Sequence, residues 1–459
     1  MTDGRMMTDA RRALMPPRVL PWLYFGVAYV SLILAFTAIA WSPRAAAGFF
    51  YHARLAGIVH LVTLGWITVS ILGALYLVGP LALRTPMPAR WPDAMAFGSV
   101  TIGIVGMIAH FWLAEFGGMA WSGMMVALGI LVVGGRTWRG LRRAPVPGAV
   151  KVHIRLAFLN IGAAATMGVL LGFDKVYRFL PGFVLANVVA HAHLAAVGWA
   201  AMMVVGIGYR MLPMVLPARM PAGRTPYASA ILLETGALGL FATLVCRSAW
   251  SALFAAAAAA GFIAFAAHVA VMLRHRLPRP RGLPAVDYAM RHAFLAFASL
   301  AVTVVLGATL ALREPSELTM RAALAYGVFG LVGFLAQMVA GMQTRLLPLL
   351  AWFTAAHRAA TPDLMPSMAA MTAQPLAGTA WGLWFWGVPA LAAGFFFNAI
   401  PLLTAGAAAL AVAAAIGAIQ AGRLAGYAFG VRGRISCGHH DAERGRVAPQ
   451  QSVVQAAQQ

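Results

Sequence analysis

Apolar runs long enough to cross a lipid bilayer recur along almost the whole of this 459-residue chain. Apolar residues make up 61% of it and charged residues only 10%, and its mean hydropathy is +0.80. Inside a bilayer the backbone must satisfy its own hydrogen bonds, so an apolar run of about 20 residues forms a helix. The sequence therefore predicts an all-α, polytopic membrane protein that is embedded in a lipid bilayer.

This criterion predicts about twelve transmembrane helices. Their ranges are 21–41, 55–79, 94–114, 118–135, 152–173, 182–212, 227–247, 250–273, 292–312, 319–346, 381–400 and 402–422. They form one predicted transmembrane domain over residues 1–423. The remaining stretch, 424–459, is polar and rich in glutamine, so we expect a disordered cytoplasmic tail there.

The basic residues predict the orientation of the chain. Short cytoplasmic loops of membrane proteins carry an excess of Lys and Arg. With the amino terminus inside, the outer segments hold few basic residues, namely Arg44, Arg54, Lys175, Arg178, Arg247, Arg313 and Arg321. We therefore expect a bacterial inner (cytoplasmic) membrane protein with both termini in the cytoplasm. The net charge of +22 is an orientation signal, and the basic residues form no continuous stripe that would indicate nucleic-acid binding.

A repeated phrase divides the chain into three parts. His60, Gly65, Trp66, Gly73, Tyr76 and Pro80 match His193, Gly198, Trp199, Gly206, Tyr209 and Pro213 at a constant offset of 133 residues. A fainter third copy, at an offset of 135, has Tyr326 and Val328 at the histidine positions and continues through Gly333, Phe334, Gly341, Arg345 and Pro348. The copies fall on the second, sixth and tenth spans. This predicts three four-helix repeats, over about 20–150, 151–275 and 290–423, around a pseudo-threefold axis along the membrane normal.

Four histidines lie in the outer parts of predicted spans: His60, His110, His191 and His193. An ionisable group in the membrane interior needs a partner, and for paired imidazoles a metal is the usual one. We consider all four as candidate metal ligands. Residues two apart on a helix point about 200° from each other, so we expect His191 and His193 to face different neighbours.

The phrase His191, His193, Gly198, Trp199, Gly206, Tyr209 and Pro213 resembles the His-x-His helix of subunit I in heme-copper oxidases of the cbb type and in related nitric oxide reductases. The resemblance implies twelve helices with threefold pseudosymmetry, one or two b-type hemes, and copper as a further cofactor. It implies that His191 binds a five-coordinate heme and that His193 and His60 bind a six-coordinate one. Arg54 and Arg178, both in outer segments, are candidates for pairing with heme propionates.

The chain departs from that family in two respects. Its histidine pair lies on the sixth span instead of the tenth, and no predicted span contains adjacent histidines, so the three-histidine copper site of the family cannot be carried over. In an alternative assignment, His60 and His110 form a reduced copper-like site that faces a heme on His191. A hydrogen-bonded packing role is a further alternative for His110.

Three classes of function follow from these observations. The first is a heme-binding membrane protein of the heme-copper oxidase type, in electron transfer or in nitric oxide or oxygen chemistry, with oxidoreductase activity left open. The second is a heme- and copper-containing protein of nitric oxide response, similar to the NnrS family. The third is a heme-free transporter or scaffold with the same helices. The chain lacks a Cys-x-x-Cys-His motif for covalent heme, so we expect any heme to be held by coordination and packing alone. Its loops are regular and contain no long soluble insertion, so we expect electrons to enter through a partner such as a cytochrome c-type subunit.

Overall fold

The computed structural model describes residues 14–47, 52–221, 223–278, 287–357 and 371–430, and every regular element in these ranges is helical. Eleven helices or unbroken helical runs among them are long and apolar enough to cross a membrane. The chain is thus a multi-pass helical membrane protein. The unbroken helices of the bundle are α2 (Leu20–Trp41), α6 (Trp91–Leu113), α7 (Phe116–Arg143), α8 (Gly148–Tyr177), α11 (Thr225–Val245), α12 (Ser251–Arg274), α13 (Tyr288–Leu312), α16 (Gln374–Phe396) and α17 (Ile400–Phe429). A short helix, α3 (Pro43–Ala46), follows α2.

The last two helices differ in their bounds from the predicted spans 381–400 and 402–422. Helix α16 has 23 residues and packs along α17, but it is not among the eleven apolar runs because its sequence is rich in Trp, Gly and Pro. It ends before Asn398, whose backbone has a left-handed φ of 51°. Helix α17 continues through Phe429, so residues 424–429 are helical where we expected the tail to begin. Residues 431–459 of that predicted tail lie outside the described ranges.

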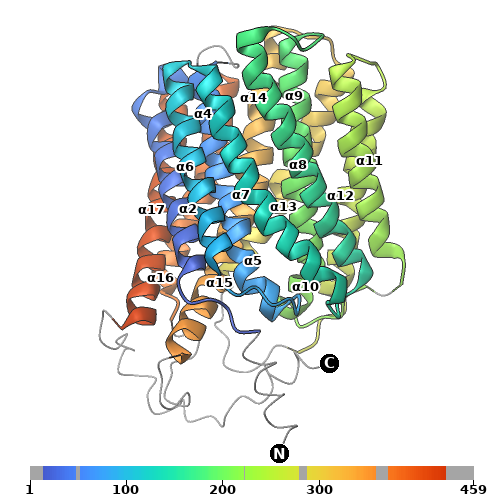
Figure 1. The fold of residues 1–459 in the computed structure, drawn as a ribbon. Coiled ribbons are helices and arrows are strands. Elements are labelled where there is room, and N and C mark those ends of the chain that lie inside the picture. The colour runs from blue at the N-terminus through green and yellow to red at the C-terminus, as the bar shows by residue number, and fades with distance from the viewer. Residues whose placement is uncertain (1–13, 48–51, 222, 279–286, 358–370, 431–459) are drawn as a thin grey trace, which may run out of the picture.

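Three of the long helices are broken in the middle by π-helix. They are α4 (Ala53–His60), η1 (Leu61–Thr68) and α5 (Val69–Leu81); α9 (Val184–His193), η2 (Leu194–Ala201) and α10 (Met202–Val215); and α14 (Glu317–Gly327), η3 (Val328–Ala336) and α15 (Gln337–Ala356). Figure 1 shows α4, α9 and α14 at the upper end of the bundle and α5, α10 and α15 below them. A π-helix bonds residue i to i+5 and is rare, and it is found most often at functional sites. Here each π segment begins within the repeated phrase.

Each π segment contains a glycine against which an unbroken helix packs closely. A Cβ atom on Gly65 would lie 2.5 Å from Ser31 Cβ, one on Gly198 would lie 2.8 Å from Asn160 Cγ, and one on Gly333 would lie 2.7 Å from Ser299 Oγ. Only glycine allows this approach, because such Cβ contacts are far inside van der Waals distance. Small residues at helix contacts are the usual basis of close packing in membranes.

Two buried indole groups connect the three broken helices at the centre of the bundle. Trp199 Nε1 in η2 donates to Thr68 Oγ1 in η1 at 3.0 Å. Trp66 Nε1 in η1 donates to the carbonyl oxygen of Ala336 in η3, also at 3.0 Å. In each case the acceptor lies two residues after the aromatic position of the neighbouring copy. The third copy has Phe334, which cannot donate and instead packs edge-on against Phe262 at 5.8 Å between ring centroids.

We predict that Thr68→Val weakens the contact between η1 and η2. Valine keeps the shape of threonine but removes the acceptor of Trp199, and a buried donor without a partner destabilises a protein by about 1–3 kcal/mol. The midpoint of thermal denaturation in detergent should fall by several degrees. Thr63→Val is the matched control, because the Thr63 hydroxyl bonds only to Val59 O of its own helix. Equal midpoints for the two variants would show that the indole bond does not hold the segments together.

Candidate functional site

Two pairs of rings meet where the upper halves of the broken helices end. His60 of α4 lies beside His191 of α9, with ring centroids 6.3 Å apart and planes 19° from parallel. His193 of α9 lies beside Tyr326 of α14, with centroids 5.9 Å apart and planes 24° from parallel. All four side chains are half-buried. Each pair therefore joins two different broken helices.

The two histidines of α9 face different neighbours, as expected from their spacing. His191 points toward α4 and His193 toward α14. The structure thus pairs His60 with His191, whereas the resemblance implied that His60 shares a site with His193. The physical reason is the 200° rotation between residues two apart, which turns His193 toward the third copy once His191 faces the first.

Hydrogen bonds at Nδ1 determine where the imidazole protons lie. His60 Nδ1 lies 2.7 Å from Ala56 O, and His191 Nδ1 lies 2.9 Å from Ala164 O. A carbonyl oxygen can only accept, so Nδ1 carries the proton in both rings. The lone pair of each neutral imidazole is then on Nε2, which is the nitrogen that can bind a metal.

The Nδ1 atom of His191 bonds to the backbone of another helix, unlike that of four other histidines in the bundle. His60, His110, His153 and His193 each bond to the carbonyl four residues earlier, which is ordinary for a histidine in a helix. His191 instead bonds to Ala164 on α8, a different helix. Gly168, one turn further along α8, makes room for the ring, because a Cβ there would lie 3.0 Å from His191 Cε1. Neither Ala164 nor Gly168 stood out in the sequence.

The Nε2 atoms differ between the two pairs. His193 Nε2 accepts a hydrogen bond from the Tyr326 hydroxyl at 3.0 Å. In the described part of the chain, Nε2 of His60 and Nε2 of His191 have no hydrogen-bond partner. His60 and His191 thus present two free Nε2 lone pairs from different helices. In the other ring pair, the Tyr326 hydroxyl occupies the lone pair of His193 Nε2.

His110 does not join either pair. Its Nε2 packs against Gly118 of α7, where an added Cβ would overlap it, and Ser122 Oγ of α7 lies 3.5 Å from its Nδ1. The next residue, Phe111, takes the place beside His60, with ring centroids 5.1 Å apart. One residue turns an α-helix by about 100°, which explains why Phe111 and not His110 faces α4. The described ranges contain no group of three or more His, Cys, Asp or Glu side chains that could hold a metal ion.

The two candidate arginines lie at the upper ends of the helices near the first pair. Arg54 is exposed in the first turn of α4, six residues before His60, or about 9 Å along the axis. Arg178 is exposed at the end of α8, where its left-handed φ of 52° terminates the helix. Both guanidinium groups are thus exposed at the upper end of the bundle.

A polar link lies five residues further along η2 from His193. Asn160 Nδ2 donates to Gly198 O at 3.1 Å and to Glu234 Oε2 at 2.7 Å. Glu234 is half-buried in the middle of α11, and no cation among the described residues is within ion-pair distance of it. The amide therefore connects α8, η2 and α11 at a depth where unpaired polar groups are unfavourable.

We predict that Gly168→Val displaces His191 from Ala164. The added side chain would occupy the volume of the imidazole, and overpacking of this kind destabilises a protein by about 1–3 kcal/mol. The midpoint of thermal denaturation should fall, whereas Gly162→Val on the same helix should leave it unchanged, because nothing lies within 4 Å of a Cβ at Gly162. A similar loss in both variants would indicate a general effect of valine on α8.

Comparison with known proteins does not assign a role to these residues. No family model matches the chain, and no curated protein matches its sequence.

Proposed function

We propose that the chain is a heme-binding integral membrane protein of electron transfer, in which His60 and His191 would hold the iron of one b-type heme. The observation that carries the proposal is the approach of these two rings from separate broken helices, 6.3 Å between centroids. In each ring Nδ1–H donates to a backbone carbonyl oxygen, and the Nε2 lone pair has no hydrogen-bond partner among the described residues.

The separation of the rings favours one shared metal. A metal lies about 2.0–2.1 Å from each imidazole nitrogen, and the nitrogen lies roughly 1 Å from its ring centroid, so one metal places the centroids about 6 Å apart. Two metals about 3.5–4 Å from each other would place them roughly 10 Å apart. The observed 6.3 Å supports a single centre.

The number of donors favours heme over a bare metal ion. Protein sites for zinc or copper use three or four side chains, whereas a heme iron takes four nitrogens from its porphyrin and needs only axial ligands from the chain. The two imidazoles of His60 and His191 would be enough for the second case. When bound, such a heme supplies one-electron redox chemistry.

The surroundings of the two rings support the same assignment. Carbonyl acceptors on Nδ1 orient ligating histidines and make them more basic, and Ala56 and Ala164 provide them here. Phe111 lies against His60 and gives the site an apolar wall. Arg54 and Arg178 are exposed at the upper ends of α4 and α8, and we propose that they pair with the propionates of the heme.

Electron transfer fits this ligand set better than gas chemistry. Iron with two axial imidazoles has no open position for oxygen or nitric oxide. A second, five-coordinate heme on His193 would require the Tyr326 hydroxyl to leave His193 Nε2. We therefore assign one heme to the chain and a packing role to the His193–Tyr326 pair.

We further propose a pseudo-threefold arrangement of the repeats. It is supported by the three π segments and by the contacts between copies, because the second histidine position of one copy meets the first position of the next in both ring pairs. The basic residues of the lower loops favour a bacterial cytoplasmic membrane with the lower end inside. The heme would then lie toward the outer face, within reach of a cytochrome c-type partner.

The ligands can be tested by optical spectroscopy of the protein purified from membranes. We expect a reduced-minus-oxidised spectrum of low-spin heme b that carbon monoxide does not change. His60→Ala and His191→Ala should each abolish or convert the low-spin bands, because each removes one axial ligand. His193→Ala and Tyr326→Phe are the matched controls and should retain them. Absence of heme bands from the unmodified protein would refute the proposal, and so would their loss in His193→Ala with retention in His60→Ala.

A further inference from the structure

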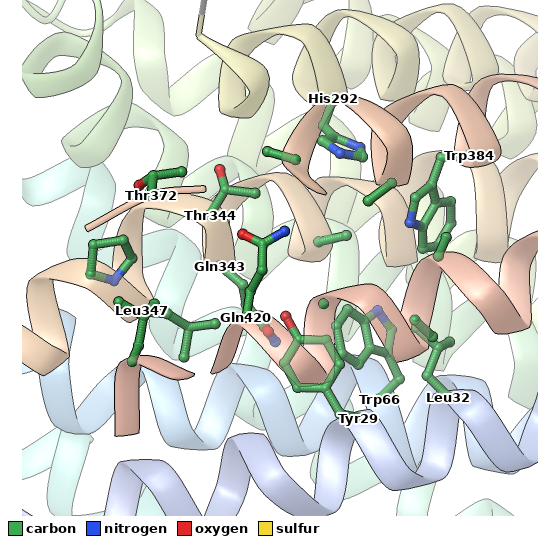
Figure 2. A pocket seen from close by; sticks show the side chains of 18 residues that line it. Tyr29, Leu32, Trp66, His292, Gln343, Thr344, Leu347, Thr372, Trp384 and Gln420 are labelled. Atoms are coloured by element: carbon green, nitrogen blue, oxygen red, sulfur yellow. The ribbon is translucent and has the colours of Figure 1, made fainter. Parts of the chain in front are cut away.

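A cavity lies in the lower half of the bundle, apart from the ring pairs. It has a volume of about 50 Å³ between α2, η1, α13, α15, α16 and α17. Most of its lining is apolar, but His292, Gln343, Thr344 and Gln420 also line it, and we call it the polar cavity. Figure 2 shows Thr372 and Leu347 at one end of it and Trp384 and Leu32 at the other. Thr372 precedes α16 at the lower end of the bundle, whereas Trp66 of η1 is six residues from His60. The cavity thus extends from the lower end to the middle of the membrane.

In the first copy, side chains fill the corresponding position. The Tyr76 hydroxyl donates to Asp93 Oδ1 at 2.7 Å. Asp93 is fully buried and forms an ion pair with Arg136 of α7. Every polar atom of this carboxylate has a partner from the chain, because Arg90 N donates to its second oxygen at 2.8 Å.

In the second copy, a different set of side chains fills the corresponding position and bonds to the tyrosine hydroxyl. The Tyr209 hydroxyl lies 2.7 Å from His268 Nδ1 and 3.0 Å from Ser229 Oγ. His153 Nε2 lies 3.0 Å from the same Ser229 oxygen. The network joins α8, α10, α11 and α12, and the tyrosine ring is at its centre.

In the third copy the aligned position is Thr344, which is too short to fill the space of a tyrosine. Its hydroxyl bonds back to Gly341 O at 2.7 Å. His292 occupies the place of His153, because its Cβ packs on Gly341 as that of His153 packs on Gly206. The cavity lies beside these residues, and His292, Gln343, Thr344 and Gln420 all line it.

The lining has hydrogen-bonding capacity that the chain does not use. Gln343 is 1% exposed; its Nε2 donates to Ser70 Oγ at 2.9 Å, but its Oε1 is buried without a partner. Buried polar atoms of this kind are normally satisfied by ordered water. A water molecule needs about 10–15 Å³ of this kind of volume, so the cavity of about 50 Å³ has room for roughly three to five.

We propose that this cavity is a water-binding site which gives solvent at the lower end access to the middle of the membrane. Water takes the place of the tyrosine hydroxyls of the first two copies and bonds to Gln343, Thr344, Gln420 and His292. The chain of waters ends near Trp66, about 9 Å along the helix axis from the depth of His60. The inference does not depend on the heme.

A second cavity provides a dry comparison within the same molecule. It has a volume of about 110 Å³ between α5, α10 and α15 and is lined mainly by apolar side chains, among them Met203, Met338 and Phe265. Gln343 and Ser70 also line it, but no polar atom is exposed to this cavity. Apolar cavities of this size stay empty of water. The larger of the two spaces should therefore be the dry one.

Hydroxyl-radical footprinting by brief X-ray exposure tests the proposal, because radicals formed from bound water modify the side chains beside it. We expect rapid modification of Tyr29 and Trp384, which line the polar cavity, although they are only 8% and 2% exposed. Met203 and Met338 should be protected, although methionine is the more reactive residue type. Protection of Tyr29 and Trp384 would overturn the proposal. Equal modification of both sets would overturn it as well, since water would then not be specific to this cavity.

Thr344→Tyr is the decisive variant, because it restores the residue of the other two copies. Modification of Tyr29 and Trp384 should fall several-fold, with Met203 unchanged as the internal control. Gln420→Leu is a second variant, which serves as the test if Thr344→Tyr does not fold. It removes a polar side chain from the lining with little change in volume, and it should lower the modification rates of Tyr29 and Trp384. Unchanged rates in a folded variant would contradict the assignment of water to this cavity.

Discussion

The two indole hydrogen bonds at the centre of the bundle fix how the three broken helices are rotated relative to one another. Trp199 bonds to η1 and Trp66 bonds to η3, so the first copy is joined to both of the others. These bonds lie about two turns below the ring pairs. A different rotation would bring other side chains together at the upper end, where His60 now meets His191 and His193 meets Tyr326.

At that upper end, the need of each intramembrane polar group for a partner separates the two pairs. His193 and Tyr326 satisfy each other, so they are stable without any added group. His60 and His191 have satisfied Nδ1 atoms but free Nε2 lone pairs. The lower half shows the same contrast, because the hydroxyls of Tyr76 and Tyr209 bond to side chains, whereas Gln343 Oε1 in the third copy is buried without a partner from the described residues.

The positions of the helices could be predicted from the sequence, but the contacts between the three broken helices could not. Hydropathy predicted the helices, and the spacing of His191 and His193 predicted that they face different neighbours. The choice of neighbour was not predictable, because the order of the copies around the axis is not encoded in a sequence offset and because π-helix changes the phase of the residues beyond it. Tyr326 was recognised only as a replacement for histidine, although its place in the repeat was the signal for its contact with His193. Phe111 and not His110 faces His60 because of the rotation of α6 about its axis. A shift of one residue changes which side chain faces α4, and hydropathy does not determine that rotation.

The central claim is that one iron has an imidazole from each of two broken helices. Near-infrared magnetic circular dichroism of the oxidised protein tests it most directly, because the charge-transfer band of low-spin ferric heme depends on its pair of axial ligands. The account predicts the band of bis-imidazole coordination and no high-spin component. A spectrum of five-coordinate heme, or of imidazole paired with any other ligand, would contradict it.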